Sequence, residues 1–523
     1  MSRTSMPRGS AAGDPAPGGS RPLPDRPNLR YLKLEAKRRL AAGEFPALHD
    51  AQVAIAWEHG LPSWTALKQR ICAQSAPDCQ VLPQLSWLIT RFRDADQGGW
   101  IAPAEQELQQ HFAPEFLAAL PAPELVATIS GVAPVLREEL AVVTQAPLTA
   151  QVQLGGLDIF ASVAADPPHK LTGLMAVPTG RQVTDPRMSA PTPARLTGTV
   201  PAGVTQIADE SAAELGLPGL TLAGGGPGTP PWLVTKGWAD VDRGDLLGPA
   251  HRWPAYCGSA LVTATAVLRL VADGRVALDT PVNDQIRTVR LEDATITVRE
   301  LLTHTAGVDS PAPSELLADH VPDLVSVTGP VVACGGPRGP VRPSNGGFAV
   351  LGQLAADVTG IPYAKAAARL VLEPLGLAGS SFPARAGDLG PDAVTGYSVT
   401  PDGALAGVPA VICVMPAIGG LWCTAADLVR LGAAWSSLLP AELAREAVRP
   451  QTDPFADGHR MGLGWIVSPG DDLALHGGAA PPASTLLRLH IRSGQVQVIL
   501  ASRLIGLGPL SERLFPAGAQ TAR

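Results

Sequence analysis

"YCGSALVTATAVLRLVADG", residues 256–274, combines a Gly-Ser turn with an apolar helical pattern. Ser259 follows Gly258 directly, the apolar residues after it recur at helical spacing, and Gly274 stands where such a helix would end. We therefore expect a tight turn at Ser259, followed by an amphipathic helix. Serine is a preferred residue at the start of a helix, so Ser259 fits the role of a cap as well as that of a nucleophile.

Six further blocks of sequence follow this helix, and their order and spacing are as informative as the helix itself. They are ITVRELLTHTAGV (296–308), RPSNGGFAVLGQLAADVTG (342–360), LEPLGLAGSSF (372–382), AIGGLWCTAADLVRLGAAW (417–435), MGLGWIV (461–467) and LALHGGAAPPASTLL (473–487). Together with the helix they closely resemble the serine β-lactamase and penicillin-binding-protein superfamily, in particular its class C β-lactamase and esterase branch. The resemblance covers about residues 200–515.

The resemblance implies both a fold and a chemistry. The implied fold is an α+β domain of the β-lactamase and transpeptidase type, in which an antiparallel sheet is flanked by helices and a helical lobe lies across a cleft. The implied chemistry is acyl transfer to a serine, with no metal and no organic cofactor. Carried over onto this sequence, the nucleophile falls on Ser259, the second motif on Pro343-Ser344-Asn345 and the third on His476-Gly477-Gly478.

Two of these three motifs depart from the family pattern. Relatives carry Ser-x-x-Lys, where the lysine lies one helical turn after the serine and, when desolvated, takes its proton. Val262 occupies that position and cannot accept a proton, and Pro343 replaces the tyrosine of Tyr-x-Asn. We expect the backbone oxyanion hole and the cleft to remain, while rapid hydrolysis of a peptide or β-lactam is lost.

The remaining motif residues are predicted to contact a ligand. Asn345 matches a family position for ligand contact, although an asparagine before a helix also satisfies local backbone groups. His476 and Gly478 lie in a strand-like run where glycine lets a ligand approach the backbone, the alternative being an ordinary surface histidine. A shifted register, Ser344-Asn345-Gly346, would make Ser344 supply a hydroxyl near Ser259.

Three other side chains are candidates on chemical grounds. Lys170, in the turn "ADPPHKLTG", is a possible accessory base that reaches over the cleft, although a solvated hairpin turn is the simpler interpretation. His304 has a structural role at a turn in the family. Cys257 is expected to be a buried structural thiol, because no histidine lies beside it in the sequence.

Composition limits the partners. The net charge of −7 provides no basic face for nucleic acid and no polybasic membrane anchor. The six scattered cysteines lack the spacing of a zinc site or of a secreted disulfide scaffold. Since there is neither an apolar signal-peptide core nor a long apolar run, we expect a cytoplasmic protein whose partner is a small ester, amide or β-lactam-like molecule.

The chain is predicted to be multidomain. Residues 1–28 are rich in proline and glycine and are predicted to be a disordered tail. Residues 29–76 are predicted to form a short helical module. Residues 81–180 change from helical patterns to three strand-like runs, as in a small α+β domain, and 181–203 read as a linker before the β-lactamase-like domain at 204–515. The small domain resembles that of the β-lactamase-like protein of clavulanic acid biosynthesis clusters, which implies secondary metabolism.

Two functions remain open from the sequence. The first is a weak esterase or acyl hydrolase that acts on a small metabolite through Ser259. The second is a pseudoenzyme that binds a metabolite or a partner peptide in the retained cleft without turnover.

Overall fold

The computed structural model of this chain describes residues 48–58, 79–178 and 192–514, apart from short internal gaps, the longest of which is 309–316. It also describes single residues between 35 and 45 and between 183 and 188. The predicted tail 1–28 and most of the predicted helical module lie outside the described residues. Of that module, the structure describes helix α2 (Leu48–Glu58).

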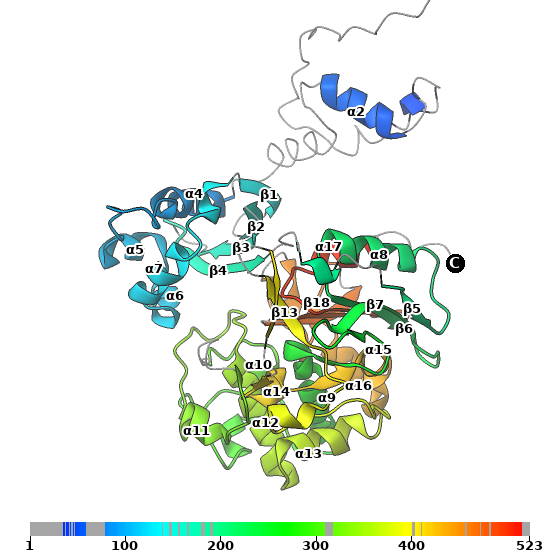
Figure 1. The fold of residues 1–523 in the computed structure, drawn as a ribbon. Helices are drawn as coiled ribbons and strands as arrows, with labels where there is room; N and C mark the ends of the chain where they lie inside the picture. Colours follow the sequence, from blue (N-terminus) through cyan, green and yellow to red (C-terminus); the bar gives the residue numbers. More distant parts are fainter. Residues whose placement is uncertain are drawn as a thin grey trace, which may run out of the picture.

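A nine-stranded antiparallel sheet forms the frame of the larger domain (Figure 1). The strand order is β17-β18-β19-β20-β21-β6-β7-β5, with β8 paired to β7 off this path. Strand β6, near the start of the larger domain, pairs with β21, the last strand of that domain. The bounds are β5 Arg195–Thr197, β6 Gly219–Gly225, β7 Trp232–Asp240, β8 Asp245–Leu246, β17 Arg460–Met461, β18 Ile466–Val467, β19 Leu473–Ala480, β20 Ala483–His490 and β21 Val496–Ala501.

Helices cover both faces of this sheet. Figure 1 shows α8 and α17 on one face and a lobe of helices on the other. The two outer helices are α8 Val204–Glu214 and α17 Gly508–Leu514. The helices of the lobe side are α9 Ser259–Ala272, α10 Val298–Leu302, α11 Leu324–Thr328, α12 Asn345–Thr359, α13 Tyr363–Ala367, α14 Pro416–Gly419, α15 Ala425–Ala434 and α16 Ala441–Ala447.

Four two-stranded sheets lie outside the large sheet in the described part of the chain. The pair that matters for the site is β9 (Arg252–Pro254) with β16 (Trp422–Thr424), in which Pro254 lies opposite Trp422. The other pairs are β10 Arg290–Leu291 with β12 Val331–Val332, β11 Leu317–Ala318 with β15 Ile412–Cys413, and β13 Gly396–Val399 with β14 Leu405–Val408. The observed architecture confirms the predicted fold class, an α+β domain with an antiparallel sheet flanked by helices.

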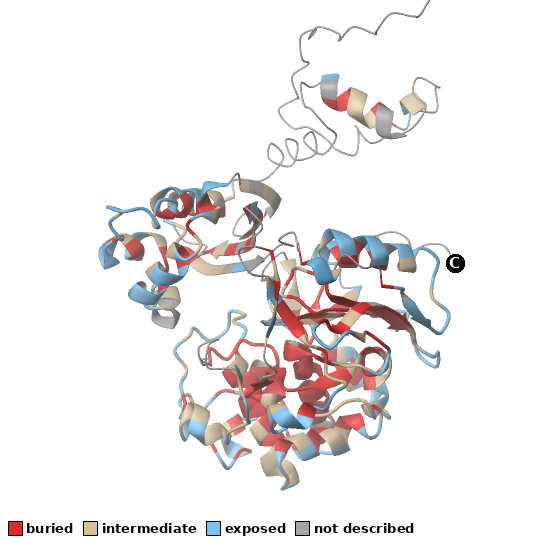
Figure 2. Cartoon of the chain, viewed as in Figure 1, coloured by how far each residue is buried: buried red, intermediate tan, exposed pale blue. Residues whose placement is uncertain are grey.

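Helix α9 is the centre of the main core, which corrects the prediction of an amphipathic helix. Residues 259–268 are buried without exception, and the helix lies among the buried residues shown in red in Figure 2. The sequence has charged side chains at the end of the helix, Arg269 and Asp273, but none in its first turns. A helix that is apolar on all sides is typical of a fully buried element rather than of a surface helix.

A smaller α+β domain precedes the large one and has its own hydrophobic core. It packs helices against a four-stranded antiparallel meander in the order β1-β2-β3-β4. We expected three strands from the alternating patterns. The fourth, β1, directly follows a run of charged residues and was missed. The bounds are α4 Val81–Phe92, α5 Glu105–His111, α6 Pro114–Ala119, α7 Ala122–Ser130, β1 Leu140–Gln145, β2 Thr149–Leu154, β3 Leu157–Val163 and β4 Leu171–Pro178.

The segment predicted as a linker, 181–203, is not irregular throughout. Its residues Arg195–Thr197 form β5, an edge strand that pairs with β7 of the large sheet. The three residues are exposed, so they lack the apolar alternation by which a strand is usually found in a sequence. The end of this segment therefore belongs to the larger domain.

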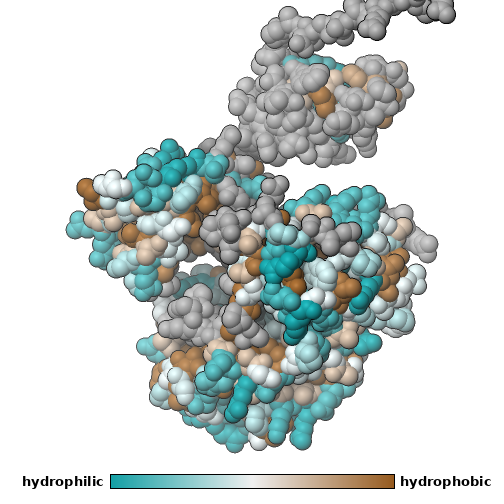
Figure 3. All heavy atoms as spheres, viewed as in Figure 1, coloured by the Kyte–Doolittle hydropathy of each residue, from teal (hydrophilic) through white to brown (hydrophobic). Residues whose placement is uncertain are grey.

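Polar and apolar residues alternate over the visible face of both domains, where hydrophilic residues are the more numerous at the helical surfaces (Figure 3). Within the part of the chain that the structure describes, no helix has the length and hydropathy needed to cross a membrane. The cytoplasmic location stays a prediction.

Candidate functional site

The turn that leads into α9 is held between two other elements of the domain. A 3₁₀ turn at Tyr256–Gly258 precedes Ser259, the first residue of α9. On one side, a Cβ atom at Gly478 of β19 would lie 2.5 Å from the Cys257 nitrogen and 2.6 Å from the Tyr256 Cβ atom. Only glycine allows β19 to approach the turn so closely. The first and third motifs are thus brought together.

On the other side, the backbone of Leu421 holds both ends of the turn. The Leu421 carbonyl accepts a hydrogen bond from the Ala255 amide at 2.8 Å. The Leu421 amide donates to the Ser259 hydroxyl oxygen at 3.0 Å. The Ser259 side chain is 0% exposed, and this is the one hydrogen bond that its hydroxyl makes in the described part of the chain. The hydroxyl is therefore a structural acceptor.

The positions one turn after Ser259 provide no base. Val262 is fully buried in the core. The neighbouring Thr263 hydroxyl donates to the Ala417 carbonyl and accepts from the Tyr363 hydroxyl at 2.6 Å. Burial raises the pKa of Tyr363, so its hydroxyl stays protonated. These contacts fix α9 to α13 and α14 and leave no proton acceptor for Ser259.

The second motif begins α12. Ser344 is the N-cap, and its hydroxyl accepts a hydrogen bond from the Gly347 amide at 3.0 Å. The alternative register, in which the Ser344 hydroxyl serves Ser259, competes with this cap. Asn345 is the first residue of α12 and is half-buried, whereas Pro343 is exposed. Asn345 is thus the accessible polar side chain of this motif.

Two buried histidines lie between the second and third motifs. His304 adopts a left-handed backbone conformation with φ 56°, and its Nδ1 atom accepts a hydrogen bond from the Ser344 amide at 3.1 Å. His476 of β19 is 5% exposed rather than a surface residue, and its Nδ1 atom has no hydrogen-bond partner among the described residues.

Burial keeps both imidazoles neutral. It lowers the pKa of His304 to about 3, with a further contribution from His476, and lowers the pKa of His476 to about 4. Among the described residues, the hydroxyl of Ser259 has the Leu421 amide as its hydrogen-bond partner, and neither ring is hydrogen-bonded to it. Among the described residues, His476 therefore has no hydrogen bond through which to activate the serine.

Neither of the other candidates, Lys170 and Cys257, supplies a base to Ser259 within the described residues. Lys170 borders a cavity of the smaller domain together with Glu105 and Phe112, and no residue of the larger domain lines that cavity. Burial raises the pKa of Cys257, so the thiol stays protonated, as expected for a structural cysteine. Within the described ranges, no group of three His, Cys, Asp or Glu side chains is arranged to hold a metal ion.

The sequence model of the Beta-lactamase family matches residues 204–509, which is more than half of the chain. The chain belongs to the beta-lactamase family. The matched residues do not include the smaller domain. The resemblance of that domain to the protein of clavulanic acid clusters therefore stays a prediction.

Relatives with known names are consistent with this membership. The chain is 24% identical over 301 residues to the putative penicillin-binding protein PbpX of Bacillus subtilis (strain 168), an alignment that spans 54% of this chain and 71% of that protein. The penicillin-binding protein from Bacillus halodurans shares the fold, with a TM-score of 0.53 and 21% identity over 60% of this chain and 99% of that one. The structure of SurE gives a TM-score of 0.50 and 26% identity over 60% of this chain and 73% of that chain.

Sequence reasoning missed the contact that decides the state of Ser259. Leu421 acts through its backbone, and no side-chain pattern indicates such a role. His304 was placed at a structural turn, and its hydrogen bond to the Ser344 amide agrees with that role. Its hydrogen bond to the start of α12 joins segments 40 residues apart and carries no signal in the linear sequence.

Replacement of Ser259 by alanine is expected to destabilise this protein. The Leu421 amide would be left buried without an acceptor, which costs about 1–3 kcal/mol. Chemical denaturation monitored by circular dichroism measures the loss. Ser211→Ala is the matched control, because the Ser211 hydroxyl is buried without a hydrogen-bond partner and its removal leaves nothing unpaired. A Ser259→Ala protein as stable as wild type would contradict a structural role.

The buried histidines predict a pH-dependent stability. Their pKa values in the folded protein lie below the unfolded value of about 6.5, so the unfolded chain binds more protons as the pH falls. The stabilisation is complete above about pH 6.5 and is lost progressively toward pH 4, with a slope of up to about 1.4 kcal/mol per pH unit for each ring. Urea unfolding between pH 4.5 and 7 measures the free energy of unfolding as a function of pH. The slope of that curve should be shallower for His476→Gln than for wild type, and an unchanged slope would argue against a neutral buried ring.

Gly478→Ala is expected to separate β19 from the turn before Ser259. The added Cβ atom would meet backbone atoms and the Tyr256 Cβ atom, which cannot rotate away. We expect a loss of about 1–3 kcal/mol in unfolding free energy. Gly508→Ala, where a Cβ atom would meet nothing within 4 Å, should leave stability within about 0.5 kcal/mol of wild type. Equal effects of the two substitutions would show that the close approach is not required.

Proposed function

We propose that this chain is a non-hydrolysing member of the beta-lactamase family that binds a small amide, ester or β-lactam-like compound and releases it unchanged. The observation that carries the proposal is the state of Ser259, whose hydroxyl is fully buried and accepts a hydrogen bond from the Leu421 amide. A nucleophile must instead be exposed to the substrate and hydrogen-bonded to a base.

The rival function is the weak acyl hydrolase. Loss of a general base typically reduces the rate about 10²- to 10⁴-fold, and both Val262 and Pro343 stand where the family has proton-transferring side chains. The buried histidines do not compensate, because neither is hydrogen-bonded to Ser259. Slow reaction with an activated ester is therefore the strongest activity to be expected of this site.

The proposed ligand contacts come from the parts of the cleft that are kept. Asn345 offers the donors of a half-buried side-chain amide at the start of α12. An amide or lactam carbonyl matches such groups, since it accepts hydrogen bonds from amide donors. The resemblance of residues 81–180 to the clavulanic acid cluster protein supports a β-lactam compound of secondary metabolism, handled in the cytoplasm.

A fluorescent penicillin tests the proposal on the full chain. Fluorescence anisotropy should rise on binding for wild type and for Ser259→Ala alike, and no label should remain after denaturing gel electrophoresis. Asn345→Ala should weaken binding about tenfold, the equivalent of one lost hydrogen bond of about 1.4 kcal/mol. A serine-directed fluorophosphonate should label neither protein.

Two results would overturn the proposal. A gel-stable penicillin or phosphonate adduct in wild type that is absent in Ser259→Ala would demonstrate an acyl-transfer nucleophile. The binding role would be refuted if the anisotropy did not rise with the wild-type protein, or if unlabelled benzylpenicillin failed to compete with the fluorescent penicillin. Val262→Lys is not a clean test of lost catalysis, because it places a charge in the fully buried core around α9.

A further inference from the structure

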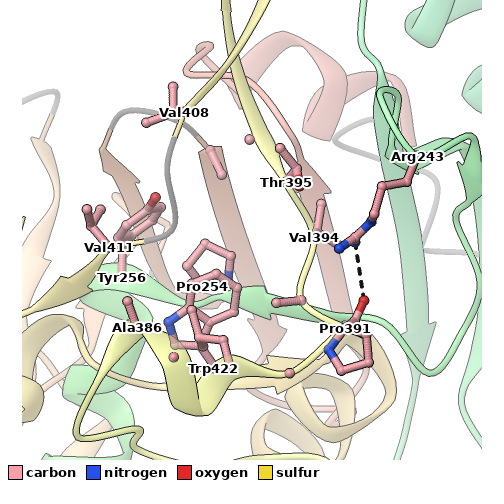
Figure 4. A pocket seen from close by; sticks show the side chains of 16 residues that line it. Arg243, Pro254, Tyr256, Ala386, Pro391, Val394, Thr395, Val408, Val411 and Trp422 are labelled. Carbon is pink, nitrogen blue, oxygen red and sulfur yellow. Dashed lines mark hydrogen bonds between the residues drawn. The ribbon is translucent and has the colours of Figure 1, made fainter. Parts of the chain in front are cut away.

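A cavity of about 340 Å³ lies next to the turn that holds Ser259 (Figure 4). Its lining includes Tyr256 of the turn and Trp422, the residue after Leu421. None of the motif residues Ser259, Asn345 and His476 lines it. The cavity is therefore separate from the site described above, although the two share a wall.

Polar and apolar groups contribute about equally to the walls of the cavity, and its apolar part includes two aromatic rings and two prolines. Pro254 and Trp422 lie opposite each other in the β9-β16 pair, and the Tyr256 ring borders the same space. Figure 4 shows Tyr256 and Val411 on one side and Arg243 and Pro391 on the other. Faces of aromatic rings and prolines favour stacking with a planar ligand.

Tyr256 takes its place at a conformational cost. Its φ angle of 44° lies in the left-handed region, which costs a residue with a large side chain about 1–2 kcal/mol. The missing side chain at Gly478 makes room for this conformation, because a Cβ atom there would lie 2.6 Å from the Tyr256 Cβ atom. Strain of this kind is concentrated at ligand sites.

The polar groups at the cavity are hydrogen-bond donors. Burial raises the pKa of Tyr256, so its hydroxyl stays protonated and can donate a hydrogen bond. The Nε atom of Arg243 lies 3.3 Å from the Oδ2 atom of Asp240, and its Nη2 atom donates a hydrogen bond to the Pro391 carbonyl at 3.4 Å. The Nη1 atom of Arg243 has no partner among the described residues. No acidic side chain is present in the lining.

From these observations we infer that the cavity binds a small planar carboxylate, that is, an aromatic or heteroaromatic acid. The ring system stacks between Tyr256, Trp422 and the prolines, and the carboxylate accepts hydrogen bonds from Arg243. A guanidinium group is suited to this role, because its donors match the two oxygens of a carboxylate. The inference does not depend on the proposed function of the Ser259 site.

Isothermal titration calorimetry of the full chain with 2-naphthoate tests the inference. We expect saturable one-to-one binding, at least about tenfold weaker binding of the neutral 2-naphthamide, and loss of that preference in Arg243→Gln. Arg243→Lys should keep part of the preference. Val408→Trp fills the cavity and should abolish binding, whereas Ser398→Trp, at an exposed position of the same hairpin outside the cavity, should not.

Each arm has a result that overturns the inference. Equal affinities for the acid and the amide would exclude recognition of the carboxylate, and unchanged binding by Val408→Trp would place the ligand elsewhere. Failure of wild type to bind 2-naphthoate would remove the site. The titration measures binding in the cavity and not labelling of Ser259, so a reactive Ser259, which would refute the proposed function, leaves this test unaffected.

Discussion

The backbone of Leu421 is the contact on which the rest of the site depends. Its carbonyl holds the amide of Ala255 and its amide holds the hydroxyl of Ser259, so one residue ties together the start and the end of the turn that opens α9. Both partners are buried, and a buried amide is costly to leave unpaired. The hydroxyl that family resemblance identifies as a nucleophile is thereby used to complete the fold.

The burial of Val262 and the use of Ser259 as a hydrogen-bond acceptor belong to the same packed helix start. With an amine at position 262, the start of α9 would have to remain polar and accessible. Val262 instead joins the main core, and Thr263 ties the same turn of the helix to α13 and α14. The first turns of α9 are thus part of a packed interior, which favours rigidity over reactivity.

Much of this architecture was predictable from the sequence. The block order fixes the sheet and the helical lobe, because each block carries its own pattern of glycines and apolar residues. Strands β2, β3 and β4 followed from alternation, whereas β1 and β5 did not. The motif residues were recognisable in the sequence, but their burial and hydrogen bonds were not. Packing between distant segments decides that Ser259 and His476 are buried and that Ser344 caps α12. The amide of Leu421 has no sequence signature.

The pairing of β6 with β21 has a consequence for how the domain forms. Leu220 is aligned with Ala501 and Gly225 with Val496, so neighbours in the middle of the sheet are separated by most of the domain's length. During synthesis, β6 can pair with β21 only after nearly the whole domain has left the ribosome. Such long-range pairing slows folding and leaves an unpaired strand edge in the nascent chain, which makes assistance by chaperones an expected requirement for efficient production.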